Sequence, residues 1–401
     1  MNILCVFGEH AYGDPARGEA YEAVNFLPAL RRLGHQVSFF ESFSRGPYAD
    51  FAGLNRALLK RVEETSPDIV FCVLMQYEVW IETLRLIRKS GSLLVNWSTD
   101  DSWKYAMFSR LIGPEFDLYA TTYPNVLECY RHDGINNVYL SQWAASAEAL
   151  VSPIPADKCR YPVSFVGAAY GNRLAMVDAL RQEGIDVACF GHGWPAGPVE
   201  AKQISEIVRE SQVSLNFSEG SRGGRRGRAD RQIKARVFEV PGFGGCLVTE
   251  KAPNLDQFFH IGEEILTFEG GDELVGTVKS LLAHPEQRDA IARRGLERVN
   301  KEHTYDRRFD ELFRELLNRV PQRPHRSIDW QEFESTARRH AFGPFLKILR
   351  SLLVACAALF YGRRRAPRAA RRMVFELSWR LFGSHTYSAS GWPGRIFYKE
   401  S

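Results

Sequence analysis

The chain has 401 residues, of which 45% are hydrophobic and 25% charged, so it is long enough for two domains and too apolar to be disordered. Its net charge of +4 is unevenly spread, because residues 321–401 carry 15 Lys and Arg against 5 Asp and Glu. The first 320 residues are therefore net acidic, which disfavours nucleic acid as a partner of the body of the protein.

The seven cysteines are dispersed and form no C-x-x-C pair, which is typical of reduced thiols rather than of a disulfide framework or a zinc site. The N-terminal M-N-I-L-C-V-F-G has no basic residue, so we expect a buried strand there instead of a signal peptide. The best membrane-span candidate, Leu352–Tyr361, has about half of the ~20 apolar residues that a bilayer requires. We therefore expect a cytoplasmic protein.

Strands and helices alternate through the first 140 residues, which predicts a parallel, doubly wound sheet. The expected elements are the strand Asn2–Phe7, a helix that ends at Gly34, a strand from Val37, helix 53–65, strand Ile69–Leu74, helix 79–90, strand Leu93–Trp97, helix 103–111, strand Leu118–Thr121, helix 124–132 and strand Val138–Leu140. Ligands bind beyond the carboxyl ends of the strands in such sheets.

Two strand ends in this half carry polar groups. At Gly8-Glu9-His10, the imidazole of His10 would bind hydroxyls or act as a base; the alternative is an ordinary solvated loop. Asp100 and Asp101 follow a strand and have tryptophans on both sides, which suits a sugar, because its ring stacks while its hydroxyls are bound. The alternatives are a helix N-cap and, least favoured, a metal site.

A second α/β half follows residues 146–162, which contain three prolines and are expected to be a linker. The expected elements are strand Val163–Val166, helix 172–183, strand Asp186–Phe190, helix 200–210, strand Val213–Asn216, strand Glu264–Phe268 and helices over 271–283, 285–299 and about 304–320. The turn that begins at Gly167 precedes a helix, so it is a candidate anion site with Arg173 as a phosphate partner.

Residues 218–231 form a Gly/Arg tract that cannot bury a core. Its place after a strand end leaves three interpretations open: a solvated loop, a lid that contacts a diphosphate, or a nucleic-acid patch.

The stretch Ala235–Glu250 reads as a helix end, a glycine-rich turn at Pro241–Gly245 and a strand at Cys246–Thr249. Arg236 and Glu239 are three residues apart, so they would share one helix face and offer a cation for phosphate and an anion for hydroxyls. Further residues expected at this site are Lys234, Gly244 and Gly245.

The motifs of residues 163–315 resemble those of the CgeB-type, spore-maturation-like glycosyltransferases, which are similar to retaining glycosyltransferases of GT-B fold. The motifs are F-G-H-G-W at Phe190–Trp194, R-V-F-E-V-P-G-F-G-G at Arg236–Gly245, L-V-T-E at Leu247–Glu250 and E-H-T-Y-x-x-R at Glu302–Arg308, with N-W-S-T-D-D at Asn96–Asp101 in the first half. The resemblance implies two facing Rossmann-like domains, with the donor bound by the second and the acceptor by the first.

In the wider retaining family a glutamate at the position of Glu239 binds the donor ribose, and another glutamate stands eight positions earlier. Here that position is Arg231, so the sugar-binding details of that family do not transfer.

The sequence therefore predicts an α/β protein of GT-B architecture with four parts: an acceptor domain 1–145, the linker 146–162, a nucleotide-sugar domain 163–320 and a basic helical tail 321–401. The expected activity is transfer of a hexosyl or related group from a UDP- or GDP-linked sugar to a glycan or lipid-linked acceptor in surface polysaccharide synthesis. Arg173, Lys234 and Arg236 would stabilise the departing diphosphate without a metal or other cofactor. The base would be Asp100, Asp101 or His10.

Two competing functions are a nucleotide-sugar epimerase of the same fold and a catalytically silent scaffold at the membrane. The scaffold hypothesis rests on the tail, where residues 342–382 read as apolar and basic helices. Such helices can lie on an anionic membrane, at the inner face of the cytoplasmic membrane. The alternative is a helical hairpin packed on the body or on a second subunit.

Overall fold

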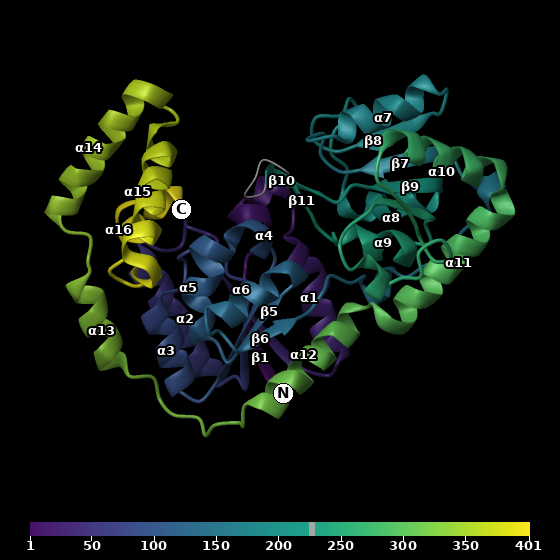
Figure 1. Cartoon of the computed structure of the whole chain (residues 1–401). Coiled ribbons are helices and arrows are strands. Elements are labelled where there is room, and N and C mark those ends of the chain that lie inside the picture. The colour runs from purple at the N-terminus through teal and green to yellow at the C-terminus, as the bar shows by residue number, and fades with distance from the viewer. Residues whose placement is uncertain (224–228) are drawn as a thin grey trace. The chain divides into compact units, whose positions relative to one another are not determined.

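The computed structural model of the chain describes residues 1–223 and 229–401. The chain divides into two units, one formed by Met1–Ser141 with Glu311–Ser401 and the other by Gln142–Asp310. Each unit contains one parallel sheet flanked by helices (Figure 1). The predicted fold class, with two parallel-sheet α/β domains and a helical C-terminal part, is confirmed.

The sheet of the first unit has six parallel strands in the order β2-β1-β3-β4-β5-β6. The strands are β1 (Asn2–Phe7), β2 (Gln36–Glu41), β3 (Ile69–Cys72), β4 (Leu93–Ser98), β5 (Leu118–Thr121) and β6 (Val138–Leu140). Four of them are buried almost throughout, as expected for parallel strands with helices on both faces.

The helices of the first unit follow the strands and then continue after the second unit. Before the second unit they are α1 (Tyr21–Arg32), α2 (Phe51–Thr65), α3 (Ile81–Lys89), α4 (Asp101–Lys104), a π-helix at Tyr105–Ser109, α5 (Arg110–Ile112) and α6 (Leu127–His132). After it they are α12 (Tyr305–Arg319), which contains the unit boundary, α13 (Trp330–Arg339), α14 (Pro344–Tyr361), α15 (Ala366–Phe382) and α16 (Trp392–Ile396). Gly34 ends the turn after α1 with a φ of 78°, a conformation that favours glycine.

The sheet of the second unit has five parallel strands in the order β13-β12-β9-β7-β8. The strands are β7 (Tyr161–Val166), β8 (Val187–Phe190), β9 (Ser211–Asn216), β12 (Leu247–Glu250) and β13 (Leu266–Phe268). Its helices are α7 (Arg173–Gln182), α8 (Ala201–Arg209), α9 (Arg236–Gly242), α10 (Gly271–Ala283) and α11 (Pro285–Glu302).

The Gly/Arg tract contains a two-stranded antiparallel ladder. Strand β10 (Glu219–Gly223) pairs with β11 (Ala229–Arg231), so that Glu219 lies opposite Arg231. Residues 224–228 lie outside the described residues, and the choice among a solvated loop, a phosphate lid and a nucleic-acid patch for the whole tract stays open.

The division into units differs from the predicted domain limits. Residues 146–162, expected as a linker, lie in the second unit, where the Val151 amide donates to the Gly242 carbonyl over 3.0 Å. Residues 321–401, expected as a separate extension, group with the first unit. One reason is the tertiary stacking of Phe333 from α13 on Trp80, with ring centroids 6.2 Å apart, because sequence periodicity predicts a helix but not its partner.

Asp117, directly before β5, links three parts of the first unit. Its buried carboxylate accepts from the Leu94 amide over 2.8 Å and from Arg323 over 2.6 Å, and it forms an ion pair with Arg88 at 3.1 Å. Arg323 belongs to the segment that enters the C-terminal helices, so this carboxylate ties that segment to the sheet edge.

We predict that Asp117→Ala lowers the free energy of unfolding by about 3 kcal/mol, because the two guanidinium groups lose a buried partner. Urea unfolding followed by circular dichroism measures the change. The control is Arg61→Ala, which removes an exposed pair with Glu64 and should cost less than about 1 kcal/mol. Equal losses in both variants would contradict a special role for Asp117.

Candidate functional site

The predicted pair of Arg236 and Glu239 forms in the structure. Arg236 donates to the Glu239 carboxylate over 2.8 Å, and Glu239 is 7% exposed. Helix α9 follows β9 and the β10–β11 ladder, so its first residues lie near the carboxyl ends of the parallel strands. The pair therefore stands at the sheet edge where α/β proteins bind ligands.

A histidine beneath α9 holds this helix in place. The ring of His303 packs against Phe238, Phe258 and Phe259 at centroid distances of 5.3 to 5.8 Å. Its Nε2 donates to the Phe258 carbonyl over 2.8 Å while Arg308 donates to Nδ1 over 2.9 Å. Burial, with the nearby Arg308, lowers the pKa of His303 to about 4, so the imidazole is neutral and can accept from the guanidinium.

The other residues predicted for this stretch differ in their surroundings. Lys234 precedes α9 and donates to the Gln232 side chain over 3.1 Å. Gly244 and Gly245 are packed against protein, because a Cβ on Gly244 would lie 2.7 Å from the Val151 carbonyl oxygen and one on Gly245 would lie 2.5 Å from Val208. These glycines allow the chain to pack closely after α9.

Arg173 and Gly167, predicted around a phosphate, make contacts within the protein. The Arg173 guanidinium donates to the Ala168 carbonyl over 2.8 Å and to the Tyr170 hydroxyl over 2.7 Å, and it stacks on the Tyr170 ring at 3.8 Å. Burial lowers the pKa of Arg173. The Gly167 carbonyl accepts from the Trp194 indole over 2.8 Å. Arg173 thus braces the turn after β7 from inside.

An internal carboxylate occupies the start of α7. Glu219 from β10 accepts from the Asn172 amide over 3.0 Å, the position at which a helix start binds an anion. A Cβ on Gly171 would lie 2.5 Å from the same carboxylate, so the glycine makes room for it.

Glu250, which the sequence reasoning did not select, is the most connected carboxylate of this unit's site. It is 1% exposed and accepts from the Asn172 side chain over 3.1 Å, from the Ser218 amide over 2.9 Å and from the Glu219 amide over 3.1 Å. Arg231, which replaces the expected glutamate, pairs with it over 3.4 Å. The signal that could have found Glu250 is its place as a polar residue that ends a buried strand.

Asp101 of the first unit is a buried structural carboxylate. It is 1% exposed and accepts from Ser98 over 2.5 Å, Ser109 over 2.5 Å and Tyr130 over 2.8 Å. These three hydroxyl groups come from the end of β4, the π-helix and α6, so Asp101 fixes the segments that follow the strand.

Asp100 is the more accessible of the two aspartates. It stands at the N-cap position of α4, but its side chain makes no capping hydrogen bond and lies 3.5 Å from the Lys104 amine. Burial raises the pKa of Glu22 in α1, and the charge of Asp100 adds to the shift. The structure thus groups Asp100 with two residues that the sequence did not indicate: Lys104, one turn further along the same segment, and Glu22 of α1, which only the fold brings near.

His10 belongs to a different group. Among residues 1–223 and 229–401, one set of three side chains has metal-binding geometry, with ligand atoms of Glu9, His10 and Glu41 within 4.8 Å of one another. Glu41 is engaged by backbone, because its carboxylate accepts from the amides of Glu9, Phe43 and Ser44. This carboxylate therefore closes the loop after β1.

The comparison with protein families matches residues 173–314 to a family described as glycosyl transferase-like. The match contains the Arg236–Glu239 pair, Glu250 and the His303–Arg308 support. A search of curated protein sequences found no match.

Three solved structures have a similar fold. Sucrose-phosphate synthase from Thermosynechococcus elongatus is 12% identical, with a TM-score of 0.57 over 80% of this chain and 100% of its own. Anabaena HepE in complex with UDP and glucose is 12% identical, with a TM-score of 0.53 over 79% and 100%. A Listeria monocytogenes protein, described as a candidate UDP-N-acetylglucosamine 2-epimerase, is 12% identical, with a TM-score of 0.51 over 81% and 99%.

Similarity at this level of identity establishes the fold, which is that of GT-B glycosyltransferases. Together with the family match it supports a glycosyltransferase. The finer resemblance to the CgeB-type family stays a prediction.

We predict that His303 makes stability depend on pH. Because its pKa is about 4 in the folded state and 6.5 otherwise, the unfolded chain binds the extra proton first as the pH falls. Stability from this group is complete above about pH 6.5, and about 3 kcal/mol is lost by pH 4. Urea unfolding across this range should show a shallower loss in His303→Gln than in the wild type. His284→Gln, an exposed control, should keep the wild-type slope.

Proposed function

We propose that the protein transfers a hexosyl or related group from a nucleotide-diphosphate sugar, with the donor bound at the Arg236–Glu239 pair. The observation that carries the proposal is this partly buried ion pair, with its nitrogen and oxygen 2.8 Å apart, at the carboxyl edge of the second sheet and inside the family match. A carboxylate can accept hydrogen bonds from two neighbouring ribose hydroxyls.

The proposed donor is a UDP- or GDP-linked sugar. The HepE structure holds UDP and glucose, which favours the uridine form for a protein of the same fold. Arg236 and Lys234 would stabilise negative charge on the departing diphosphate. Arg231 adds a cation at the place where retaining relatives of this fold have a glutamate, so recognition of the sugar should differ from theirs.

The proposed acceptor is a glycan or a lipid-linked glycan of surface polysaccharide synthesis, bound by the first unit. Asp100 is the base candidate that the structure favours, because it is partly exposed and lies beside Lys104, whereas Asp101 is buried under three hydroxyl groups. A base is required by an inverting enzyme.

A nucleotide-sugar epimerase is the second candidate, because the Listeria protein shows that a chain described in those terms has this fold. Release of a free epimerised sugar without acceptor would favour it. A silent scaffold would bind no nucleotide at all.

We predict that Glu239→Ala weakens UDP binding about 10- to 100-fold, because a charged acceptor for ribose hydroxyls is lost. Arg236→Ala should also weaken UDP, since the diphosphate loses a cation. Isothermal titration calorimetry with UDP and GDP gives the affinities, and circular dichroism verifies the fold.

The matched control is Glu183→Ala, which removes an exposed carboxylate paired with Lys279 at the far end of α7. It should bind UDP as the wild type does. Wild-type affinity in Glu239→Ala would show that the donor site lies elsewhere.

We predict that sugar transfer is unchanged by EDTA, because Arg236 and Lys234 replace the cation that a metal would supply. Transfer is measured after EDTA treatment, with and without added Mn²⁺. Loss of activity that Mn²⁺ restores would contradict this. If His10→Asn then abolished the Mn²⁺ response, the metal would lie at Glu9, His10 and Glu41.

A further inference from the structure

The hairpin of α14 and α15 exposes an apolar surface. One face of α14 repeats at helical spacing and is open to solvent, with Phe345, Ile348, Leu352 and Leu359 between 60% and 83% exposed. On α15, Met373, Leu377 and Leu381 form a second stripe four residues apart and are 51% to 69% exposed. Exposed apolar side chains that form continuous stripes mark an interaction surface.

The hairpin is also strongly basic, mainly at the turn between the helices and in the first half of α15. Residues 342–382 contain nine Lys and Arg and one acidic residue, Glu376. An open groove of about 1540 Å³ beside α15 is lined by six arginines and by apolar side chains that include Tyr361, Met373 and Leu377; the arginines are Arg363, Arg364, Arg365, Arg368, Arg371 and Arg372. Its volume exceeds the roughly 300–1,000 Å³ of small-molecule pockets, so it suits an extended surface better than an enclosed ligand.

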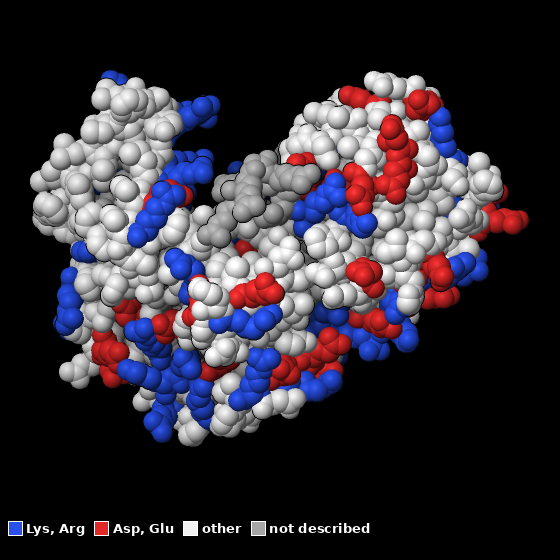
Figure 2. All heavy atoms as spheres, viewed as in Figure 1, with Lys and Arg blue, Asp and Glu red and all other residues white. Residues whose placement is uncertain are grey.

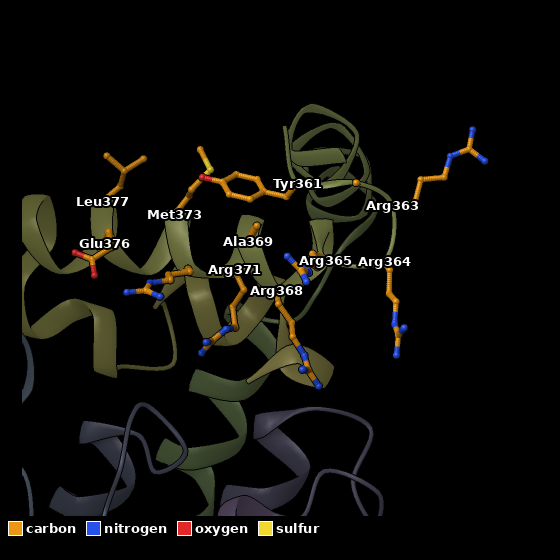
Figure 3. Close-up of a pocket in the computed structure, with 12 residues that line it drawn as sticks. Tyr361, Arg363, Arg364, Arg365, Arg368, Ala369, Arg371, Met373, Glu376 and Leu377 are labelled. Atoms are coloured by element: carbon orange, nitrogen blue, oxygen red, sulfur yellow. The ribbon is translucent and has the colours of Figure 1, made fainter. Parts of the chain in front are cut away.

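Figure 3 shows that apolar and basic side chains of this region point in different directions. Tyr361, Met373 and Leu377 point to one side of α15, whereas Arg368 and Arg371 point to the other and Arg363 and Arg364 project from the turn between the helices. In Figure 2 the same region, at the upper left, is mostly white with blue patches. Arg371 donates to Gln76 and Tyr77 of the same unit, whereas Arg363, Arg364 and Arg365 are exposed and open to a charged interface.

Helix α14 has 18 residues and a mean hydropathy of 1.6, so by length and composition it could cross a membrane. The sequence analysis counted only the uninterrupted apolar run from Leu352, whereas the whole helix, with Lys347 and Arg350 included, reaches this length and hydropathy. In the structure, Arg350 bonds to Glu400 and lies over the Phe397 ring at 5.7 Å.

Leu346 and Ala357 of α14 are buried in a small core shared with Val374 of α15 and Ile396 of α16. Insertion of α14 across a bilayer would break these contacts. A hairpin that stays folded and rests on the membrane keeps them.

We propose that the α14–α15 hairpin docks this protein on an anionic lipid bilayer. Its apolar face enters the boundary between headgroups and acyl chains, and Arg363, Arg364 and Arg365 bind headgroup phosphates. Charge selects this occupant: the exposed Arg363, Arg364 and Arg365 beside the apolar face match a negatively charged surface. The inference does not rest on the proposed enzymatic activity.

The test is sedimentation of the full chain with phosphatidylcholine vesicles, with and without phosphatidylglycerol, in the absence of any nucleotide. The wild type should bind the anionic vesicles and be released by high salt or alkaline carbonate. Leu352→Glu with Leu359→Glu should abolish binding. Arg363→Ser, Arg364→Ser and Arg365→Ser together should weaken it about a hundredfold.

Two matched controls should bind like the wild type. Leu317→Glu places a charge on an exposed leucine of α12, and Arg293→Ser, Arg294→Ser and Lys301→Ser together remove three exposed cations from α11. Unchanged circular dichroism in all variants shows that they fold.

Three results would overturn the proposal. Equal binding to neutral and anionic vesicles would remove the role of the arginines, and resistance to carbonate would mean that α14 spans the bilayer. A wild type that ignores vesicles but is a dimer, with the glutamate variant monomeric, would assign the face to a second copy of the chain. Nucleotide binding tests the proposed enzymatic function instead, and it is measured separately because it bears on none of these three results.

Discussion

The second unit depends on one neutral imidazole. His303 can accept a hydrogen bond from Arg308 only while it is uncharged, and it stays uncharged because three phenylalanines exclude water around it. One of these rings, Phe238, immediately precedes Glu239 on α9. The imidazole, its guanidinium partner and the aromatic cluster therefore set where the Arg236–Glu239 pair stands at the sheet edge.

Two further carboxylates lie at the same edge of the sheet. Glu250 ends β12 and collects donors from Asn172, Ser218 and Arg231, so one buried carboxylate joins the turn after β7 to the β10–β11 ladder. Glu219 fills the anion position at the start of α7. A diphosphate that used this helix start would have to displace Glu219, whereas one bound at Arg236 would not.

In the first unit, residues 321–401 are anchored to the domain that the first 141 residues form. Asp117 binds Arg323, and Phe333 stacks on Trp80, so the C-terminal residues are built into the unit before the hairpin begins. Beyond those anchors, α15 also contacts Gln76 and Tyr77 through Arg371 and Phe375, and α14 and α15 share a small core and each leave one apolar stripe exposed. Residues 321–401 therefore pack against the rest of the first unit at some positions and expose an apolar surface at others.

By itself, the sequence determined the alternation of strands and helices, because buried parallel strands need continuous apolar runs and amphipathic helices need a period of 3.6. It also placed Arg236 and Glu239 on one face, since three residues of helix bring side chains together. Tertiary structure alone decided what the other polar residues do. Asp101, Gly244 and Gly245 contact residues distant in sequence, and Glu22 and Glu250 join their groups only when separate elements meet. Local periodicity carries no information on such pairings, because they depend on sheet order and on which side chains exclude water.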